Sequence, residues 1–251
     1  DTFLGPDIMK KIVNYLQEHR EQKEIIIFNS HYHWDHHWGN CYFSDSWIIS
    51  HELCREKIIE NGKEELEKYI KFHRGEIKLH PPNIVFKHKM NFIEEDIFFF
   101  HSPGHTKDSS SCYDKNDKIL FAADNVEIPI PYLNQNPDDL DTYQNTLRNY
   151  LDLACKKVIP GHGHISGNEL IEKNLIYIES FPEIPQELLK NKNRKMLLHI
   201  HFHNLQAHAL GYEKRNKKKK AQEFYQKMCD FAEKWAILEN QQLEKLKKKL
   251  F

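Results

Sequence analysis

The stretch from Asn29 to Asn40 reads NSHYHWDHHWGN and places four histidines and one aspartate within twelve residues. Its centre is the pattern His31-x-His33-x-Asp35-His36. Imidazole nitrogens and carboxylate oxygens are good ligands for zinc, iron and manganese. Because alternate side chains of an extended segment share a face, His31 and His33 are expected to bind one ion. If the chain turns helical after His33, Asp35 and His36 are expected to reach a second ion.

Three more candidate ligands each follow a strand-like run of apolar residues. His105 lies in the Pro-Gly turn of HSPGHT, Asp124 ends the run ILFAAD, and His162 lies in the Pro-Gly turn of VIPGHG. Sites in α/β proteins are commonly assembled from loops at one edge of the sheets. A cluster of surface histidines explains neither the Pro-Gly turns nor Asp124, so metal binding is the preferred interpretation.

In their order and types, these four motifs resemble those of the metallo-β-lactamase-fold hydrolase superfamily, over about residues 1–181. The resemblance implies an α/β fold, a four-layer αβ/βα sandwich with a dinuclear metal site on one edge. Zinc is the expected metal, and iron or manganese would suit the same donors. By the resemblance, the ligands are His31, His33 and His105 for the first ion, Asp35, His36 and His162 for the second, and Asp124 as a bridge.

The resemblance also implies a hydrolase, in which a metal-bridging hydroxide cleaves an ester, thioester, lactone or amide bond of a small molecule. Asp35 would be the catalytic residue that orients the nucleophile and accepts its proton. Asp124 disfavours antibiotic hydrolysis, since true β-lactamases of this fold generally lack a bridging aspartate there. The alternatives are a phosphodiesterase or nuclease of the same superfamily, a mononuclear iron persulfide dioxygenase, a di-iron oxygen reductase, and a non-catalytic scaffold. His33 argues against the oxygen reductase, which usually has an acid there.

Apolar periodicity and turn residues predict alternating strands and helices, which is an α/β pattern. The helix from 51 to 74 contains Gly62 and is expected to break there. The predicted helices cover 5–20, 51–74, 137–155 and 167–181, and the predicted strands cover 24–30, 47–50, 83–89, 96–102, 110–115, 118–124 and 156–160.

The character of the chain changes after residue 181. Residues 1–181 are predicted to form the catalytic domain, and residues 182–251 a helical C-terminal extension that packs on this domain or on a partner. A homodimer through the C-terminal helices is one such arrangement. The family usually has two or three strands before the position where this sequence starts, so we expect either that those strands are absent or that this sequence is truncated.

The segment HIHFHNLQAH holds four histidines whose role the family does not explain. As a strand it would place the first three on one face, and as a helix it would pair His199 with His203. Three roles remain open for these histidines: a second metal site, a polar helix face, or side chains turned toward the mouth of the active site. The four residues are His199, His201, His203 and His208.

Composition limits the classes of partner. The 251 residues are 39% hydrophobic and 29% charged, which supports a packed core, and the net charge of −1 attracts neither nucleic acid nor an anionic membrane. The lysine run 214–220 is read as a solvated helix start. Five scattered cysteines suggest free thiols in a reducing compartment. We therefore expect a cytoplasmic protein with a small-molecule substrate and with neither nucleic acid nor a membrane as partner.

Other residues near the motifs receive structural interpretations. Trp34 and Trp38 are expected to pack the ligand loop against the core, and His37 to point away from the ligands. His164, just past the last motif, could face substrate or support a ligand. Lys107 is read as a solvated loop lysine.

Overall fold

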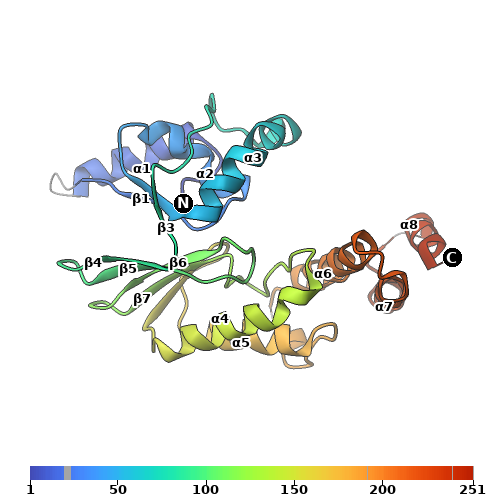
Figure 1. Cartoon of the computed structure of the whole chain (residues 1–251). Coiled ribbons are helices and arrows are strands. Elements are labelled where there is room, and N and C mark those ends of the chain that lie inside the picture. The colour runs from blue at the N-terminus through green and yellow to red at the C-terminus, as the bar shows by residue number, and fades with distance from the viewer. Residues whose placement is uncertain (20–23, 191, 239, 251) are drawn as a thin grey trace. The chain divides into compact units, whose positions relative to one another are not determined.

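The structure is a computed structural model of the whole chain, and it describes residues 1–19, 24–190, 192–238 and 240–250 (Figure 1). Two compact units make up the chain, Asp1–Lys115 and Asn116–Phe251. We refer to them as the first and the second unit. No helix among the described residues is long and apolar enough to cross a membrane.

The first unit is built around a parallel sheet of β1 (Ile27–Asn29), β2 (Ile48–His51) and β3 (Ile84–Phe86). The β-branched runs predicted as strands form β1 and β2, which are buried along their whole length, as expected for parallel strands covered on both faces. Helix α1 (Pro6–His19) matches the helix predicted over 5–20, of which Arg20 lies outside the described residues. The core that α1 shares with the sheet consists of Met9, Val13, Ile27, Phe43 and Ile48.

Helices follow the first two strands of this sheet. After β1 the chain turns into α2 (Trp34–His37) and the 3-10 helix η1 (Trp38–Phe43), and after β2 into α3 (Glu52–Lys68) and η2 (Ile70–Phe72). The predicted break at Gly62 is wrong. Helix α3 continues through Gly62, where a Cβ would lie only 2.6 Å from a methyl carbon of Leu79, so the glycine serves close packing.

A second sheet in the first unit is antiparallel, with β4 (Lys89–Phe92) paired to β5 (Ile97–His101) and β5 paired to β6 (Ser110–Asp114). The strand predicted over 83–89 is confirmed in part: β3 lies within it, but its last residue, Lys89, already begins β4. The chain leaves the parallel sheet after β3 and enters the antiparallel sheet at Lys89, so one apolar-rich run serves two sheets.

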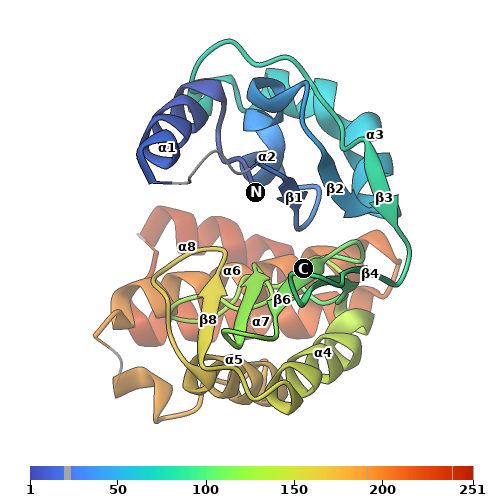
Figure 2. The same ribbon diagram turned by 90° about the vertical axis from the view of Figure 1, so that its left-hand side faces the viewer.

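The second unit begins with a parallel pair, β7 (Ile119–Ala123) and β8 (Lys157–Pro160), in which Leu120 pairs with Val158. The connection between them carries η3 (Pro137–Asp139) and α4 (Leu140–Asp152). Helix α5 (Asn168–Ser180) follows β8 and lies beside α4 (Figures 1 and 2).

The described part of the C-terminal region is helical, with η4 (Leu188–Lys190), α6 (Arg194–Lys214), α7 (Lys218–Trp235), α8 (Asn240–Lys247) and η5 (Lys248–Leu250). Helices α6 and α7 pack against each other. The histidine-rich segment lies within α6, which settles its strand-or-helix alternative in favour of a helix. The domain boundary after residue 181 stays a prediction.

Candidate metal centre

Three imidazoles converge in the first unit, from positions far apart in the sequence. His31 follows β1, His33 immediately precedes α2, and His105 lies in the turn after β5. The Nδ1 atom of His33 lies 2.9 Å from Nε2 of His31 and 3.1 Å from Nε2 of His105. His31 is 1% exposed and His105 is 6% exposed, so this cluster is largely shielded from water.

Hydrogen bonds fix which nitrogen of His31 carries its lone pair. The Ser30 hydroxyl donates to Oδ2 of Asp1 at 2.8 Å, because an ionised carboxylate only accepts. The Ser30 oxygen can then accept from Nδ1 of His31, which lies 3.0 Å away. His31 is thus an Nδ1–H tautomer, and its Nε2 presents a lone pair to the other two rings.

The donor set fits a divalent metal ion. Three nitrogens that bind one zinc ion at roughly 2.0–2.1 Å in tetrahedral geometry stand about 3.3 Å apart, close to the two nitrogen separations observed. Hydrogen bonding alone explains the cluster less well, because a single Nδ1 of His33 faces two ring nitrogens and can engage only one of them directly. His31, His33 and His105 therefore have the types and the geometry of a three-histidine metal site.

His36 and Asp35 lie beside this cluster in the same unit. Nδ1 of His36 donates to Oδ2 of Asp1 at 2.8 Å, which leaves Nε2 as its ligand atom. Nε2 of His36 lies 3.7 Å from Oδ2 of Asp35. The two side chains come from the same short helix α2, as predicted from the expected turn into helix after His33.

Asp1 is a candidate supporting residue that the sequence motifs did not indicate. Its carboxylate orients His36 directly and His31 through Ser30, and the backbone N–H of Ser30 also donates to its Oδ1 at 2.7 Å. Outer carboxylates of this kind fix the tautomer and raise the basicity of ligating histidines. A lone aspartate nearly thirty residues before the motif carries no spacing signal that would have identified it.

We expect the Asp1→Asn variant to bind zinc about 10- to 100-fold more weakly, because both carboxylate oxygens of Asp1 accept hydrogen bonds and an amide has only one acceptor oxygen. Its NH2 group would face either the backbone N–H of Ser30 or the Ser30 hydroxyl and His36. Competition titration with a chromophoric chelator measures this affinity. Asp45→Asn, at an exposed aspartate of the same unit, is the matched control. Equal affinity in both variants would mean that Asp1 does not support the ligands.

The ligand loop has further anchors within the first unit. The buried carboxylate of Asp108 accepts the backbone N–H of Tyr32 at 2.8 Å, between the first two histidines. Trp38 is 1% exposed, in agreement with the predicted packing role, and Trp34 stacks on Tyr69 with ring centroids 4.8 Å apart. These contacts anchor the ligand loop on both sides of α2, at Tyr32 before the helix and at Trp38 after it.

The other two predicted ligands, Asp124 and His162, lie in the second unit. Asp124 follows β7 and His162 follows β8, and Oδ2 of Asp124 lies 3.6 Å from Nε2 of His162. The Tyr143 hydroxyl donates to the backbone carbonyl of Asp124 at 3.1 Å and fixes the loop. Gly161 lies against Asp124, because a Cβ at position 161 would overlap Oδ1 and come within 2.8 Å of the Asp124 nitrogen.

The other histidines and Lys107 lie as follows. His37 is buried, and desolvation lowers its pKa to about 3. His164 and Lys107 are exposed. On α6, His201 and His208 are buried while His199 and His203 are exposed, and none of the four belongs to a group of candidate metal ligands among the described residues. The structure therefore gives no support to a second metal site on α6.

Comparison with known proteins identifies the family. Residues 1–162 match the family model described as "Metallo-beta-lactamase superfamily". A curated relative, "Beta-lactamase-like protein 2 homolog" of Drosophila melanogaster, is 25% identical over 191 residues, which are 74% of this chain and 60% of the relative. The chain thus spans about 60% of the length of that relative.

Solved structures with similar folds are metallo-β-lactamases. TMB-1 has a TM-score of 0.59 at 18% identity, over 73% of this chain and 80% of that chain. The mono-zinc form of FIM-1 from Pseudomonas aeruginosa has a TM-score of 0.57 at 18% identity, over 74% of this chain and 79% of that chain. At this level of identity, the similarity supports a shared fold and gives no support for a shared activity. The family model, which covers more than half of the chain, confirms the resemblance read from the motifs: this chain belongs to the metallo-β-lactamase superfamily and has its α/β fold.

Proposed function

We propose that this chain is a dinuclear metal-dependent hydrolase that cleaves an ester, thioester, lactone or amide bond in a small molecule. Seven side chains would hold the two ions, namely His31, His33, His105, Asp35, His36, His162 and Asp124. Zinc is the metal that the donor set favours first.

The observation that carries this proposal is the convergence of three ring nitrogens in the first unit, with the tautomer of His31 fixed for ligation. Two of these rings, those of His31 and His105, are buried, which shields the candidate site from bulk water. Membership of the superfamily supports the hydrolytic class.

When bound, divalent ions would lower the pKa of a coordinated water toward neutrality and polarise the oxygen of the scissile bond. The chain's own groups have distinct parts in this scheme. Asp35, with about a quarter of its side chain exposed, would orient the attacking water and accept its proton. Asp1 would keep the imidazole of His36 in its ligating tautomer while the substrate changes. His162 has half of its side chain exposed, so this ligand faces solvent and leaves access for a substrate.

Charge supports a small molecule over a nucleic acid as the substrate. The chain has 36 basic and 37 acidic residues, a balance that gives no general attraction for a polyanion.

Elemental analysis of protein purified without chelator tests the proposal, alongside assays with p-nitrophenyl acetate, an acyl thioester, a lactone and bis(p-nitrophenyl) phosphate. Two metal ions per chain are expected, with turnover of one of the first three substrates. Asp124→Asn is expected to lower both metal content and turnover, and Asp152→Asn, at an exposed aspartate of the second unit, to change neither.

Two outcomes would replace the proposal. Turnover of the phosphodiester alone would indicate the phosphodiesterase alternative. One iron per chain, with oxygen consumed in the presence of glutathione persulfide, would indicate the dioxygenase alternative.

A further inference from the structure

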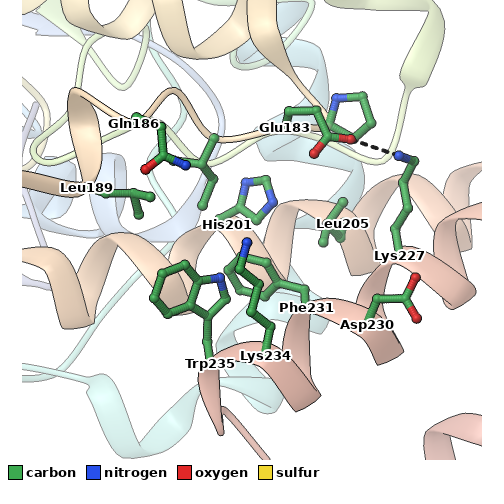
Figure 3. A pocket seen from close by; sticks show the side chains of 12 residues that line it. Glu183, Gln186, Leu189, His201, Leu205, Lys227, Asp230, Phe231, Lys234 and Trp235 are labelled. Atoms are coloured by element: carbon green, nitrogen blue, oxygen red, sulfur yellow. Dashed lines mark hydrogen bonds and ion pairs between the residues drawn. The ribbon is translucent and has the colours of Figure 1, made fainter.

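A pocket of about 310 Å³ lies within the second unit, away from the ligand motifs in the sequence (Figure 3). Its walls come from α6, α7 and the segment 182–189 that precedes and enters η4. This volume lies at the lower end of the range for small-molecule sites. His201, one of the four histidines whose role the family resemblance leaves unexplained, lines this pocket.

Helix α7 turns one continuous face to this pocket. Lys227, Asp230, Phe231, Lys234 and Trp235 all line it, at the spacings of i, i+3, i+4, i+7 and i+8. A face that only packs against the core would be apolar at these positions. Two ammonium groups beside two aromatic rings instead give a wall that can both stack on a flat molecule and neutralise a negative charge.

A chain of hydrogen bonds fixes the tautomer of His201. Oδ1 of Asn204 accepts the backbone N–H of Leu133 at 2.9 Å, so the Asn204 amide nitrogen is the donor to the Tyr177 hydroxyl, also at 2.9 Å. The same nitrogen donates to the carbonyl of Pro131 at 2.9 Å.

The Tyr177 hydroxyl, having accepted from Asn204, directs its own hydrogen to Nδ1 of His201, 3.1 Å away. His201 must then carry its hydrogen on Nε2. Burial lowers the pKa of His201 to about 3, so the ring stays neutral near pH 7. His201 therefore supplies the pocket with a fixed N–H donor.

The charges around the pocket are unevenly compensated. Lys227 is paired with Glu183 at 2.9 Å, as Figure 3 shows, and Asp230 accepts from the Gln226 amide at 2.7 Å. Lys234 has no carboxylate partner among the described residues, and its ammonium lies 5.3 Å from the Trp235 ring centroid.

A neighbouring hollow of about 350 Å³ shares Trp235 and adds more positive charge. Arg194 and Lys195 line it, and the Arg194 guanidinium lies 4.8 Å from the Trp235 ring centroid. Four basic side chains therefore surround the two hollows, against two acidic ones, so the local potential favours an anion.

We propose that this pocket binds a small organic anion that carries a planar ring. The ring stacks against Trp235 and Phe231, and the anionic group accepts hydrogen bonds from Nε2–H of His201 and the ammonium of Lys234. The shared chemistry fits an aromatic carboxylate and an aromatic phosphate alike. This site is separate from the proposed hydrolytic function, and its binding does not depend on metal.

Calorimetric titration of the intact chain tests the proposal, with indole-3-acetate as the carboxylate and adenosine 5′-monophosphate as the phosphate. Each experiment is repeated with chelator present, so that binding through the metal centre is recognised. One molecule of at least one probe is expected to bind per chain, with indole alone and acetate alone at least about tenfold weaker. The probe that binds identifies the anionic group.

Three variants on α7 assign the site. Lys234→Gln is expected to weaken binding about fivefold, and Asp230→Asn to strengthen it about twofold, because the change removes a negative charge beside the ligand. Lys219→Gln, at an exposed lysine of the same helix outside the pocket, is the matched control and is expected to leave binding unchanged.

Several results would overturn the proposal. These are failure of both probes to bind, binding that chelator abolishes, equal affinity of indole alone, and weaker binding in Asp230→Asn, which would indicate a ligand with a positive charge. Nitrogen-15 correlation spectra of the histidine rings give an independent check. They should report His201 as the Nε2–H tautomer at pH 7, and an Nδ1–H tautomer would remove the proposed donor.

Discussion

Replacement of His33 by alanine is expected to remove the metal ion of the three-histidine cluster and to lower hydrolytic turnover by at least about 10³-fold. His33 lies at the centre of the cluster, since its Nδ1 is the atom that both other rings approach, at 2.9 and 3.1 Å. Two imidazoles alone hold a divalent ion poorly, and without the ion, water has no means to ionise near neutral pH.

Metal content per chain and turnover of the best substrate from the screen are the measurements, with circular dichroism to confirm that the variant is folded. His88→Ala, at an exposed histidine of the same unit, is the matched control. A His33→Ala chain with full metal content and full turnover would remove the three-histidine cluster from the proposed site.

Local patterns predicted the ligand motifs because the features that define them are local. The alternation of His31 and His33, followed by a turn into helix, requires only neighbouring residues, and α2 begins at Trp34 as this pattern predicts. The Pro-Gly turn with His105 was likewise recognised because it ends an apolar run. Its approach to His33, 72 residues away in sequence, is tertiary structure that the family resemblance implied and spacing could not.

Residues that act through others escaped the sequence analysis. Asp1 matters only because folding brings it next to Ser30 and His36, and no periodicity encodes that meeting. The run 83–89 has the composition of a single strand, yet the chain changes sheets within it, which composition cannot indicate. The histidines of α6 formed a visible pattern in the sequence. The tautomer of His201, however, depends on hydrogen bonds made by Tyr177 and Asn204, which the pattern does not indicate.

Substitution of Gly161 by alanine should be as informative about the second unit as His33→Ala is about the first. The added Cβ would overlap Oδ1 of Asp124 and lie 2.8 Å from the Asp124 nitrogen and 2.9 Å from the Ala123 carbonyl carbon. The last two are backbone atoms, so a side-chain rotation cannot relieve the overlap. The Gly161 N–H also donates to the Ala123 carbonyl at 2.8 Å, which ties the two loops together.

We therefore expect Gly161→Ala to displace the Asp124 carboxylate from His162, to lower turnover about 100-fold, and to destabilise the chain by about 1–3 kcal/mol. Urea denaturation measures the stability, and elemental analysis at a temperature where the variant is folded measures the metal content. Gly167→Ala is the matched control from the same connection, because its added Cβ meets only the carboxylate end of Glu169, an exposed side chain that can rotate away.

The effect of Gly161→Ala on turnover has to be compared with its effect on stability. If Gly161→Ala were destabilised but kept full turnover and metal content when folded, the place of the Asp124 carboxylate would serve packing alone, and the bridging role proposed for it would fail. If turnover and metal content fall in Gly161→Ala while Gly167→Ala retains both, the site requires the close approach of Gly161 to Asp124. The reason would be that the Asp124 carboxylate occupies the space that a side chain at position 161 would fill. The absence of a Cβ at this glycine would then be as much a part of the site as the ligands themselves.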